Sequence, residues 1–436
     1  LMALILLGVP GNKISGVKVF AADNTLKICM GDSNTARHHK AVALGEETEE
    51  LRFVLKEGSA KSSSYISSNP SCFKIKNTTE GKCIVEALAE GSGLVILTVK
   101  TKEGITYTEK LFISVYTRIG NNNGVVNKNT NVYMGASVSS GVENYDNKGD
   151  LAKNTKLTVT ASCGQFYIFK TLDGTTFRDG KDTGFIKKSD INILASSIKI
   201  NEDGTSIEVK EKKQFRVTIM PDITTNKNVD WNVSDSKIAT MDSNGWLLGK
   251  TEGTVLVTAS TKDGTNRKNS VYVSVYSRLD GIAGYLKADS KLFKVANDKV
   301  ERGVGTQKAE LTIVGTCGDY YRVKMNNKTF YNDGDSNSYC YIPKNKVAIA
   351  VTDIALNKNT IKVRYNLNKT ILLKCTVKPN NASVPQIEWF SSDNNIATVS
   401  SMGKVTIKKW GKVSISARSK DNPNKKVSCY INVMAR

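Results

Sequence analysis

Short segments in which apolar and polar residues alternate recur along the whole chain. Residues 255–260 read Val-Leu-Val-Thr-Ala-Ser, and residues 271–275 read Val-Tyr-Val-Ser-Val. Such strict alternation is typical of strands that bury one face. Turn dipeptides such as Asn244-Gly245 and Asp263-Gly264 separate segments of this kind at hairpin spacing. Few segments show a helical period, so the pattern predicts an all-β protein.

A longer pattern occurs three times. Residues 231–253 and 389–411 each begin with a tryptophan, continue through a polar turn into Ile-Ala-Thr, and end on a glycine. Residues 67–91 form a more divergent copy. The final glycines of the three copies lie 162 and then 158 residues apart. A repeat of this length indicates a string of whole domains and not a solenoid of small units.

The three copies resemble the bacterial Ig-like domain, group 2, of secreted and surface proteins. The resemblance rests on the run Trp-Ser-Ser-Asp-x-x-Ile-Ala-Thr-Val-Asp-x-x-Gly followed by Glu-Gly, which is specific in the last two copies and weak in the first. It implies β-sandwiches of about 80–90 residues each. Because the repeat is about twice that length, a second module must fill each gap.

The two gaps also match each other. Residues 157–170 align with residues 311–324, and both contain a cysteine, a glycine turn and an aromatic strand. A closing strand follows, at residues 184–186 in the first gap and 340–342 in the second. This order resembles the bacterial Src-homology-3-like barrel.

The two resemblances together predict a tandem array of three Ig-like sandwiches that alternate with two Src-homology-3-like barrels. No proline-rich or Gly/Ser-rich linker separates the modules, and residues 121–124 are the best candidate for a hinge. The expected boundaries are 1–22 for a partial signal peptide, 23–119, 193–278 and 348–436 for the sandwiches, and 120–192 and 279–347 for the barrels.

Residues 1–22 contain an apolar run that is too short to span a bilayer, followed by small residues of the kind that signal peptidase accepts. We interpret this segment as the tail of a secretory signal. The alternative is an extra apolar strand that packs on the first sandwich.

Eight cysteines in a secreted protein would usually form disulfides. In the last copy, however, Cys375 and Cys429 occupy the positions that Val217 and Val271 fill in the middle copy. Such replacement favours buried thiols that act as small apolar residues. The pairs that could still form bridges are Cys317 with Cys340 and Cys72 with Cys83.

The chain offers few groups for catalysis. His38 and His39 are the only histidines. Adjacent residues of a strand point to opposite faces, so the two rings cannot both join one site. Such a pair lies more often in a solvated loop than in a set of ligands, and a solvated loop is expected here. The acidic cluster at residues 46–50 has adjacent and not spaced carboxylates, which favours a solvated loop over a calcium site. Sequence motifs for nucleophile elbows, phosphate loops and zinc proteases do not occur. We therefore predict no catalytic residue, no metal and no cofactor, and a protein that is not an enzyme.

The formal charge of +21 is spread unevenly. Residues 23–119 carry 13 basic and 12 acidic residues, whereas residues 348–436 carry 15 basic and 4 acidic residues. This asymmetry favours an anionic partner at the last module, and the alternative is that the lysines serve solubility. A secretory location disfavours nucleic acid, so an anionic cell-wall polymer or a host glycan is the expected partner.

One departure from the repeat marks a candidate site. Where the middle copy has Glu252, the last copy has Trp410. An exposed tryptophan among lysines is suited to sugar stacking and polyanion binding; the alternative is that Trp410 packs against its own module. The predicted ligand-binding residues are Trp410, Lys408, Lys409 and Lys412, followed by the aromatic pairs Phe166-Tyr167 and Tyr320-Tyr321.

These observations predict a non-catalytic protein, secreted or cell-wall associated, of a Gram-positive, Clostridia-like bacterium. Both resemblances imply adhesion or wall binding and not turnover, which is an inference from family alone. We expect a monomer, with no nucleic acid partner and no membrane insertion of the mature chain. The alternatives are the targeting arm of a larger cell-wall hydrolase and a structural component of a phage or fibre.

Overall fold

The computed structural model describes residues 18–20, 25–137, 147–202, 204–326, 339–367 and 369–435. The chain divides into two compact units. One unit contains the residues up to 198 together with 219–228 and 261–267, and the other contains the remaining residues. Apart from short 3-10 turns, the described elements are all strands, which confirms the predicted all-β class. Across these ranges no helix combines the length and the apolar character needed to cross a membrane.

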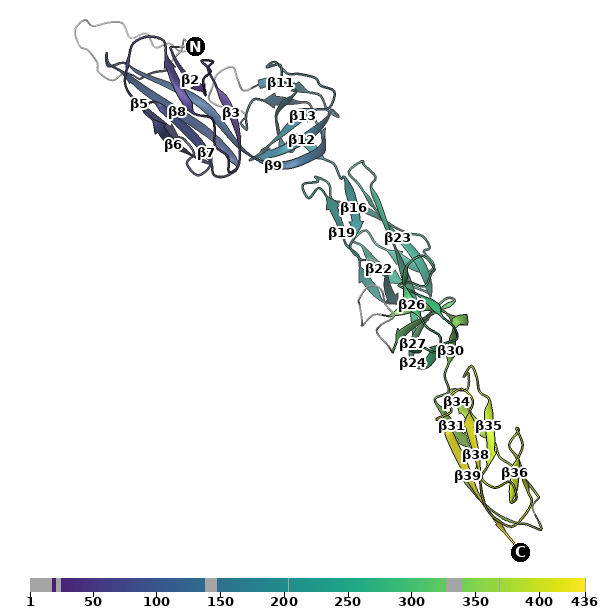
Figure 1. Cartoon of the computed structure of the whole chain (residues 1–436). Coiled ribbons are helices and arrows are strands. Elements are labelled where there is room, and N and C mark those ends of the chain that lie inside the picture. Colours follow the sequence, from purple (N-terminus) through teal and green to yellow (C-terminus); the bar gives the residue numbers. More distant parts are fainter. Residues whose placement is uncertain are drawn as a thin grey trace. The chain divides into compact units, whose positions relative to one another are not determined.

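The first sandwich consists of two sheets (Figure 1). Its strands are β1 (Lys18–Phe20), β2 (Leu26–Met30), β3 (His39–Ala43), β4 (Leu51–Leu55), β5 (Ala60–Ser67), β6 (Phe73–Thr79), β7 (Lys82–Ala87), β8 (Gly91–Thr101) and β9 (Thr106–Val126). One sheet has the order β2-β4-β7-β6 and the other β5-β8-β9. Strands β1 and β3 both pair in parallel with β9. Of the predicted signal peptide, residues 18–20 therefore form a strand, and the other residues lie outside the described ranges.

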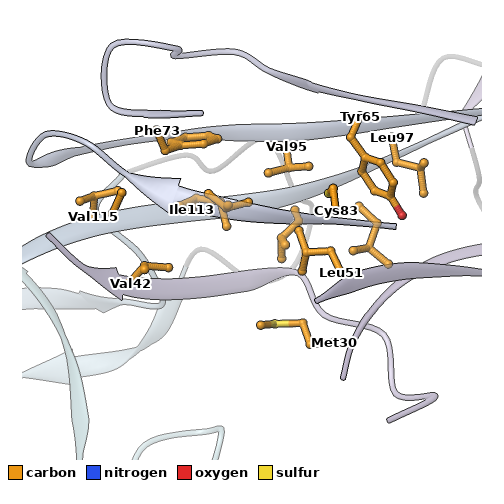
Figure 2. Close-up of a cluster of buried hydrophobic side chains, with 14 of the residues drawn as sticks. Met30, Val42, Leu51, Tyr65, Phe73, Cys83, Val95, Leu97, Ile113 and Val115 are labelled. Atoms are coloured by element: carbon orange, nitrogen blue, oxygen red, sulfur yellow. The ribbon is translucent and has the colours of Figure 1, made fainter. Parts of the chain in front are cut away.

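The core of the first sandwich lies between these two sheets. Figure 2 shows Val95 and Leu97 of β8 and Ile113 of β9 among the clustered side chains. Leu51 and Cys83 come from the opposite sheet, and all five side chains are fully buried. Alternate residues of each strand face this core, as the sequence pattern predicts.

Strand β9 continues beyond the sandwich into a further sheet, which we call the first linker sheet. Its other strands are β10 (Thr130–Tyr133), β11 (Asn147–Leu151), β12 (Lys156–Cys163), β13 (Phe166–Thr171), β14 (Thr183–Lys187) and β15 (Ile191–Ile193), with a 3-10 turn at η1 (Lys188–Asp190). The order is β11-β10-β14-β13-β12-β9, and β15 pairs with β9 as well.

A second sandwich and a second linker sheet repeat this arrangement. The strands of the second sandwich are β16 (Ser197–Ile200), β17 (Thr205–Glu208), β18 (Lys212–Gln214), β19 (Val217–Met220), β20 (Val229–Val233), β21 (Ala239–Met241), β22 (Trp246–Gly249), β23 (Gly253–Thr261) and β24 (Lys268–Leu286). Its sheets have the orders β20-β23-β24 and β18-β22-β21, and β17 pairs in parallel with β24.

The second linker sheet again begins with the end of the long strand, here β24. It adds β25 (Ser290–Phe293), β26 (Glu301–Gly305), β27 (Glu310–Cys317), β28 (Tyr320–Met325), β29 (Cys340–Pro343) and β30 (Val347–Ile349), with η3 (Lys344–Lys346) before the last strand. The order is β24-β27-β28-β29-β25-β26, and β30 pairs with β24, which matches the first linker sheet strand for strand.

The third sandwich has the same topology as the second. Its strands are β31 (Asp353–Leu356), β32 (Thr360–Arg364), β33 (Thr370–Leu372), β34 (Cys375–Lys378), β35 (Ile387–Ser391), β36 (Ala397–Val399), β37 (Lys404–Ile407), β38 (Gly411–Ser419) and β39 (Lys426–Met434). The sheets are β35-β38-β39, with β32 parallel to β39, then β33-β37-β36, and β31-β34.

The long strands β9 and β24 cross the predicted boundaries after residues 119 and 278 without interruption. The predicted hinge at residues 121–124 is wrong, because Asn122 and Gly124 pair with Val159 and Leu157 of β12. Backbone hydrogen bonds therefore hold these residues in a sheet. The assignment of the linker sheets to Src-homology-3-like barrels and the module boundaries stay predictions.

The polar turn of the repeated motif makes the same contacts in all three copies. The Oγ atoms of Ser68, Ser234 and Ser392 accept a hydrogen bond from a neighbouring strand, at 2.7, 2.9 and 2.9 Å. The donors are the backbone N–H groups at Leu94, Leu256 and Ser414. The divergent first copy thus folds its motif as the other two do.

Backbone geometry requires the last glycine of each copy. Gly91, Gly253 and Gly411 have φ angles of +152°, +152° and +142°, a region that residues with a Cβ rarely adopt. A Cβ on Gly253 would lie 2.5 Å from Cδ1 of Ile238, and one on Gly411 would lie 2.7 Å from Cδ1 of Ile396. Because these isoleucines begin the Ile-Ala-Thr segment, the two halves of the motif depend on each other.

Polar contacts fasten the first linker sheet to the first sandwich. The Glu90 carboxylate accepts hydrogen bonds from Ser162 Oγ and from the Gly164 N–H, both at 2.7 Å. The Ala136 N–H donates to Ser114 Oγ at 3.1 Å. We call the contacts of the glutamate with the linker sheet the glutamate clasp.

The second linker sheet is fastened in the same way. Glu252 accepts hydrogen bonds from Thr316 Oγ1 at 2.6 Å and from the Gly318 N–H at 3.3 Å. The Ala296 N–H donates to Ser274 Oγ at 2.7 Å. Burial opposes ionisation of Glu252, but its hydrogen bonds outweigh burial and lower the pKa of the carboxyl below its ordinary value. The clasp is therefore made by an ionised carboxylate.

None of the eight cysteines forms a disulfide. Neither Cys72 with Cys83 nor Cys317 with Cys340 forms a disulfide. Cys429 is fully buried, as predicted, whereas Cys375 is half-buried. The sulfur atoms therefore contribute by packing and not by cross-linking.

Replacement of Gly253 by alanine should destabilise the second sandwich by about 2–4 kcal/mol, because the new Cβ adds overlap with Ile238 to the cost of a positive φ. Differential scanning calorimetry measures the loss. The control is Gly264→Ala, since Gly264 has a φ of +90° but open space around its Cβ position, and it should lose about 1–2 kcal/mol. Equal losses in the two variants would contradict the steric explanation.

The double variant Cys375→Val, Cys429→Val should fold with a change of at most about 2 kcal/mol, because nearly isosteric core replacements cost little. Thermal unfolding under reducing and non-reducing conditions tests this. Loss of the folded state, or a bridge found by mass mapping of the wild-type chain, would disprove the packing role.

Glu252→Gln should loosen the second linker sheet at pH 7 by about 1 kcal/mol, since a partly exposed charged acceptor is replaced by a neutral one. A carboxyl with a lowered folded-state pKa stabilises the fold above its unfolded pKa, and this contribution disappears as pH falls through the folded pKa. The difference from wild type should therefore shrink between about pH 5 and pH 3. Hydrogen exchange of β27 and β28 amides measures it, and a pH-independent difference would contradict the ionised clasp.

Candidate functional site

The third sandwich has different residues at the positions that form the clasp. Gly411 pairs with Val433 as Gly253 pairs with Val275, so the copies superpose without a shift in register. Trp410 then stands where the first two sandwiches have glutamate. Lys412 and Asn432 stand where the second sandwich has Thr254 and Ser274, which contact the linker sheet. This end of the third sandwich therefore lacks the carboxylate of a clasp.

Trp410 lies on the surface, and 58% of it is exposed. The Lys409 Nζ atom is 5.9 Å from the centre of its ring. The backbone N–H groups of Lys408 and Lys409 donate to the Ile396 carbonyl at 2.8 and 3.2 Å. These bonds fix the turn, so the tryptophan and its neighbouring lysines are presented on an ordered loop.

A cavity of about 290 Å³ lies on the same sandwich and is lined by Lys412, Tyr430 and Asn432, among others. Tyr430 is 66% exposed. We call the surface made by Lys408, Lys409, Trp410, Lys412, Tyr430 and Asn432 the 410 face. The alignment of copies could have identified Tyr430 as an outward-facing residue, because outward positions of β39 correspond to outward positions of β24. The degree of its exposure could not be predicted, because it depends on neighbouring strands.

The lysines of the 410 face carry free charge. Within the described residues no carboxylate lies within 4.0 Å of Lys408, Lys409 or Lys412, and the ion pair of this sandwich that the structure shows joins Arg418 to Glu388 at 2.8 Å. Unpaired lysines beside an exposed indole and a phenol form a surface with both cationic and stacking groups. Such a surface is suited to a sugar polymer that bears negative charge.

The aromatic pairs of the linker sheets are arranged differently from the prediction. Phe166 and Tyr167 are 6% and 9% exposed, so they pack in the interior and provide no open ligand surface. Tyr320 is half-buried in a cluster with Phe293 and Cys317. Tyr321 packs against the core of its own sheet. The aromatic strands were predicted correctly, but their faces are covered by the neighbouring sandwich or by their own sheet.

Lysine side chains lie over the rings of Tyr167 and Tyr321. The Lys188 Nζ atom lies 5.0 Å from the Tyr167 ring centre, and the Lys344 Nζ atom lies 5.5 Å from that of Tyr321. Lys188 also donates to Ser162 beside the clasp at 2.7 Å. These residues therefore serve the junction between the sandwich and the linker sheet.

His39 lies in the first junction, the contact region between the first sandwich and the first linker sheet. The expectation that it lies in a solvated loop was wrong. Its Nε2 atom lies 3.0 Å from Ser114 Oγ, and its ring stacks on Phe112 at 5.7 Å. Burial first, and then the charges of Lys148 and Lys181, lower the pKa of His39 to about 3. The ring is therefore neutral at ordinary pH and contributes packing and a hydrogen bond.

The acidic cluster of the first sandwich makes ion pairs. Glu47 binds Lys76 at 2.6 Å, and Glu50 binds Lys82 at 2.8 Å. Across the described ranges no group of three or more His, Cys, Asp or Glu residues is placed to hold a metal ion. These carboxylates are therefore engaged by lysines of neighbouring strands.

The family model of the bacterial Ig-like domain (group 2) matches residues 195–272 and 350–430. These segments contain the second and third copies of the motif, so the resemblance is confirmed for them. The first copy lies outside the matched residues, and its likeness rests on the hydrogen bonds that it shares with the other two. The matched segments are thus similar to bacterial Ig-like domains.

Two relatives illustrate how far the likeness extends. An uncharacterized protein of Clostridium acetobutylicum is 22% identical over 241 residues, which cover 55% of this chain and 17% of that protein. A 3-O-alpha-D-galactosyl-alpha-L-arabinofuranosidase of Bifidobacterium longum subsp. longum is 31% identical over 109 residues, which cover 25% of this chain and 10% of that enzyme. The chain thus spans less than a fifth of the length of either relative.

Solved structures with a similar arrangement include domains 4–9 of the surface layer protein SbsC, with 11% identity and a TM-score of 0.19 over 94% of this chain and 66% of that one. Mouse cadherin-23 EC22-24 gives 9% identity and a TM-score of 0.22 over 95% of this chain and 100% of that one.

Proposed function

We propose that the chain is a non-catalytic part of an extracellular protein that binds an anionic cell-wall glycopolymer through the 410 face. The observation that carries this proposal is the exchange of a clasp glutamate for Trp410 within an otherwise repeated framework. A position that fastens one sheet to another in the first two sandwiches instead presents an exposed indole among lysines. The class of the matched modules supports a surface or accessory role.

Charge supports the choice of a polyanion. The third sandwich carries most of the excess of basic residues, and the lysines of the 410 face have no carboxylate partners among the described residues. Electrostatic attraction of this kind concentrates a charged polymer near the surface and is screened at high salt. The Trp410 and Tyr430 rings add stacking, which depends little on salt.

A second candidate function is that of an accessory arm within a larger enzyme. The Bifidobacterium arabinofuranosidase favours this candidate, because the likeness covers a small part of a long enzyme. Sequencing of the coding region on both sides of residues 1–436 separates the two proposals. A glycosidase or wall-hydrolase domain in the same reading frame would support the arm, and binding by the 410 face would then serve to target the enzyme.

The charge-reversed variant Lys408→Glu, Lys409→Glu should bind purified Gram-positive walls about tenfold more weakly at low salt, since two exposed charge contacts of about 0.2–1 kcal/mol each are lost and become repulsive. Trp410→Ala should weaken binding several-fold but leave its salt dependence almost unchanged. Sedimentation of the full-length chain with walls, at increasing salt, measures both effects.

The matched control is Lys425→Glu, Lys426→Glu, which makes the same change of charge at the opposite end of the β38–β39 hairpin. Lys426 pairs with Arg418, seven register steps from Gly411. Equal losses in the two charge-reversed variants would show that the lysines act through total charge alone. Unchanged binding by both would exclude the proposed site, and preferential binding to a sulfated host glycan would move the partner from the wall to the host.

A further inference from the structure

A second site is indicated on the second linker sheet, away from the 410 face. A cavity of about 480 Å³ is lined by Tyr276, Arg278, Asp280, Arg322 and Tyr339, among others. The strand β24 bulges beside it, since three residues between Arg278 and Ile282 have no partners on β27. Bulges of this kind commonly redirect side chains at binding sites.

The Arg322 guanidinium is held between two tyrosine rings. Its central carbon lies over the Tyr276 ring at 4.2 Å and over the Tyr339 ring at 3.8 Å. Contacts of this type use the face of the planar group and leave the N–H donors at its edge available. The Nε–H is buried and has no hydrogen-bond acceptor. The side chain is therefore fixed in position, and at least one of its donors has no acceptor among the described residues, which is costly.

Arg278 brings a second cation to the same cavity. Its counterpart in the first junction, Arg118, forms an ion pair with Glu46 at 2.9 Å. Glu46 belongs to a loop that is longer in the first sandwich than in the second. In the second junction, by contrast, no carboxylate of the described residues lies within 4.0 Å of Arg278 or Arg322. The second junction therefore keeps two free guanidinium groups where the first has one that is neutralised.

The first linker sheet shows that the fold does not need this arrangement. The register places Ile168 at the position of Arg322, since Ile168 pairs with Phe185 as Arg322 pairs with Tyr341. Thr183 takes the position of Tyr339, since each lies two residues before the paired aromatic residue, Phe185 or Tyr341. The same sheet order forms with an apolar residue and a threonine, so the arginine and the tyrosine serve something other than folding.

We propose that this cavity binds an acidic sugar and that Arg322 takes its anionic group, a carboxylate or a phosphate. A guanidinium with free edge donors binds either group through paired, charge-assisted hydrogen bonds. The cavity is larger than such a group alone requires, and Asp280 can accept hydrogen bonds from hydroxyl groups of the attached ring. This site lies on a different module from the 410 face and does not depend on the proposed function.

Isothermal titration calorimetry of the 436-residue chain at low salt tests the proposal. The background is the triple variant Lys408→Glu, Lys409→Glu, Trp410→Ala, in which both the charge and the stacking of the 410 face are removed. The probes are glucuronate and glucose 1-phosphate, with glucose and inorganic phosphate for comparison. We expect saturable binding of one of the two acidic sugars to one site, weaker binding of phosphate, and no binding of glucose. Tighter binding of glucuronate would assign the anionic group as a carboxylate, and tighter binding of glucose 1-phosphate would assign it as a phosphate.

The decisive variant is Arg322→Ile, which introduces the residue that the first linker sheet already accommodates. It should lower the affinity at least tenfold, whereas Arg322→Lys should retain part of it because the charge remains but the paired donors are lost. Lys324→Ile is the control, since it removes one charge from the exposed side of the same strand outside the cavity. Unchanged affinity in Arg322→Ile, an equal loss in Lys324→Ile, or no binding of either acidic sugar by the parent chain would overturn the proposal. Thermal unfolding verifies that each variant is folded.

Discussion

One dipeptide at the start of a central strand determines how each sandwich closes and what its end can contact. The glycine of this pair adopts a positive φ and leaves room for an isoleucine or cysteine side chain of the preceding turn. The residue before this glycine then lies at the end of the sandwich, where the linker sheet follows in the first two copies. Where that residue is glutamate, as at Glu90 and Glu252, it binds the linker sheet; where it is Trp410, the same geometry presents an indole to solvent.

Local pattern was sufficient to predict most strands. The alternating segments at residues 255–260 and 271–275 lie in β23 and β24, and the glycine turn at Gly245 lies between β21 and β22. The sequence left open whether Trp410 is exposed at its turn or packs against its own module, and the structure shows it exposed. These predictions succeed because side-chain burial in a sandwich follows the period of the strand.

Features that depend on distant partners were not predictable. Residues 121–124 are polar and contain glycine, which is typical of a loop, yet they form a strand because β12 and β15 pair with them. His39 looked solvated because its neighbours are polar, but the linker sheet and Phe112 bury it. The aromatic strand with Phe166 and Tyr167 was predicted, but its burial was not, because Phe166 packs beside residues of the first sandwich and Tyr167 packs in the core of its own sheet.

The internal repeats separate what the framework requires from what individual copies have acquired. The serine contacts and the positive-φ glycine occur in all three sandwiches, and the two linker sheets share one strand order. Arg322, Tyr339 and Trp410 each occur once, at positions where another copy folds with a different residue. Equivalent positions of the repeated modules can thus be compared within one chain, which distinguishes residues that the fold requires from residues that one copy alone has.

The parallel pairing of early and final strands has a mechanical consequence. In the second and third sandwiches, β17 and β32 run parallel to β24 and β39, with four and five residue pairs respectively in register. Tension applied along the chain would pull two such strands in opposite directions along their axes. Their hydrogen bonds would then be loaded together and would resist in shear, instead of opening one after another from an end. A protein tethered in flowing liquid at one end and bound to a polymer at the other would experience this load, and each sandwich would bear it as a single mechanical element.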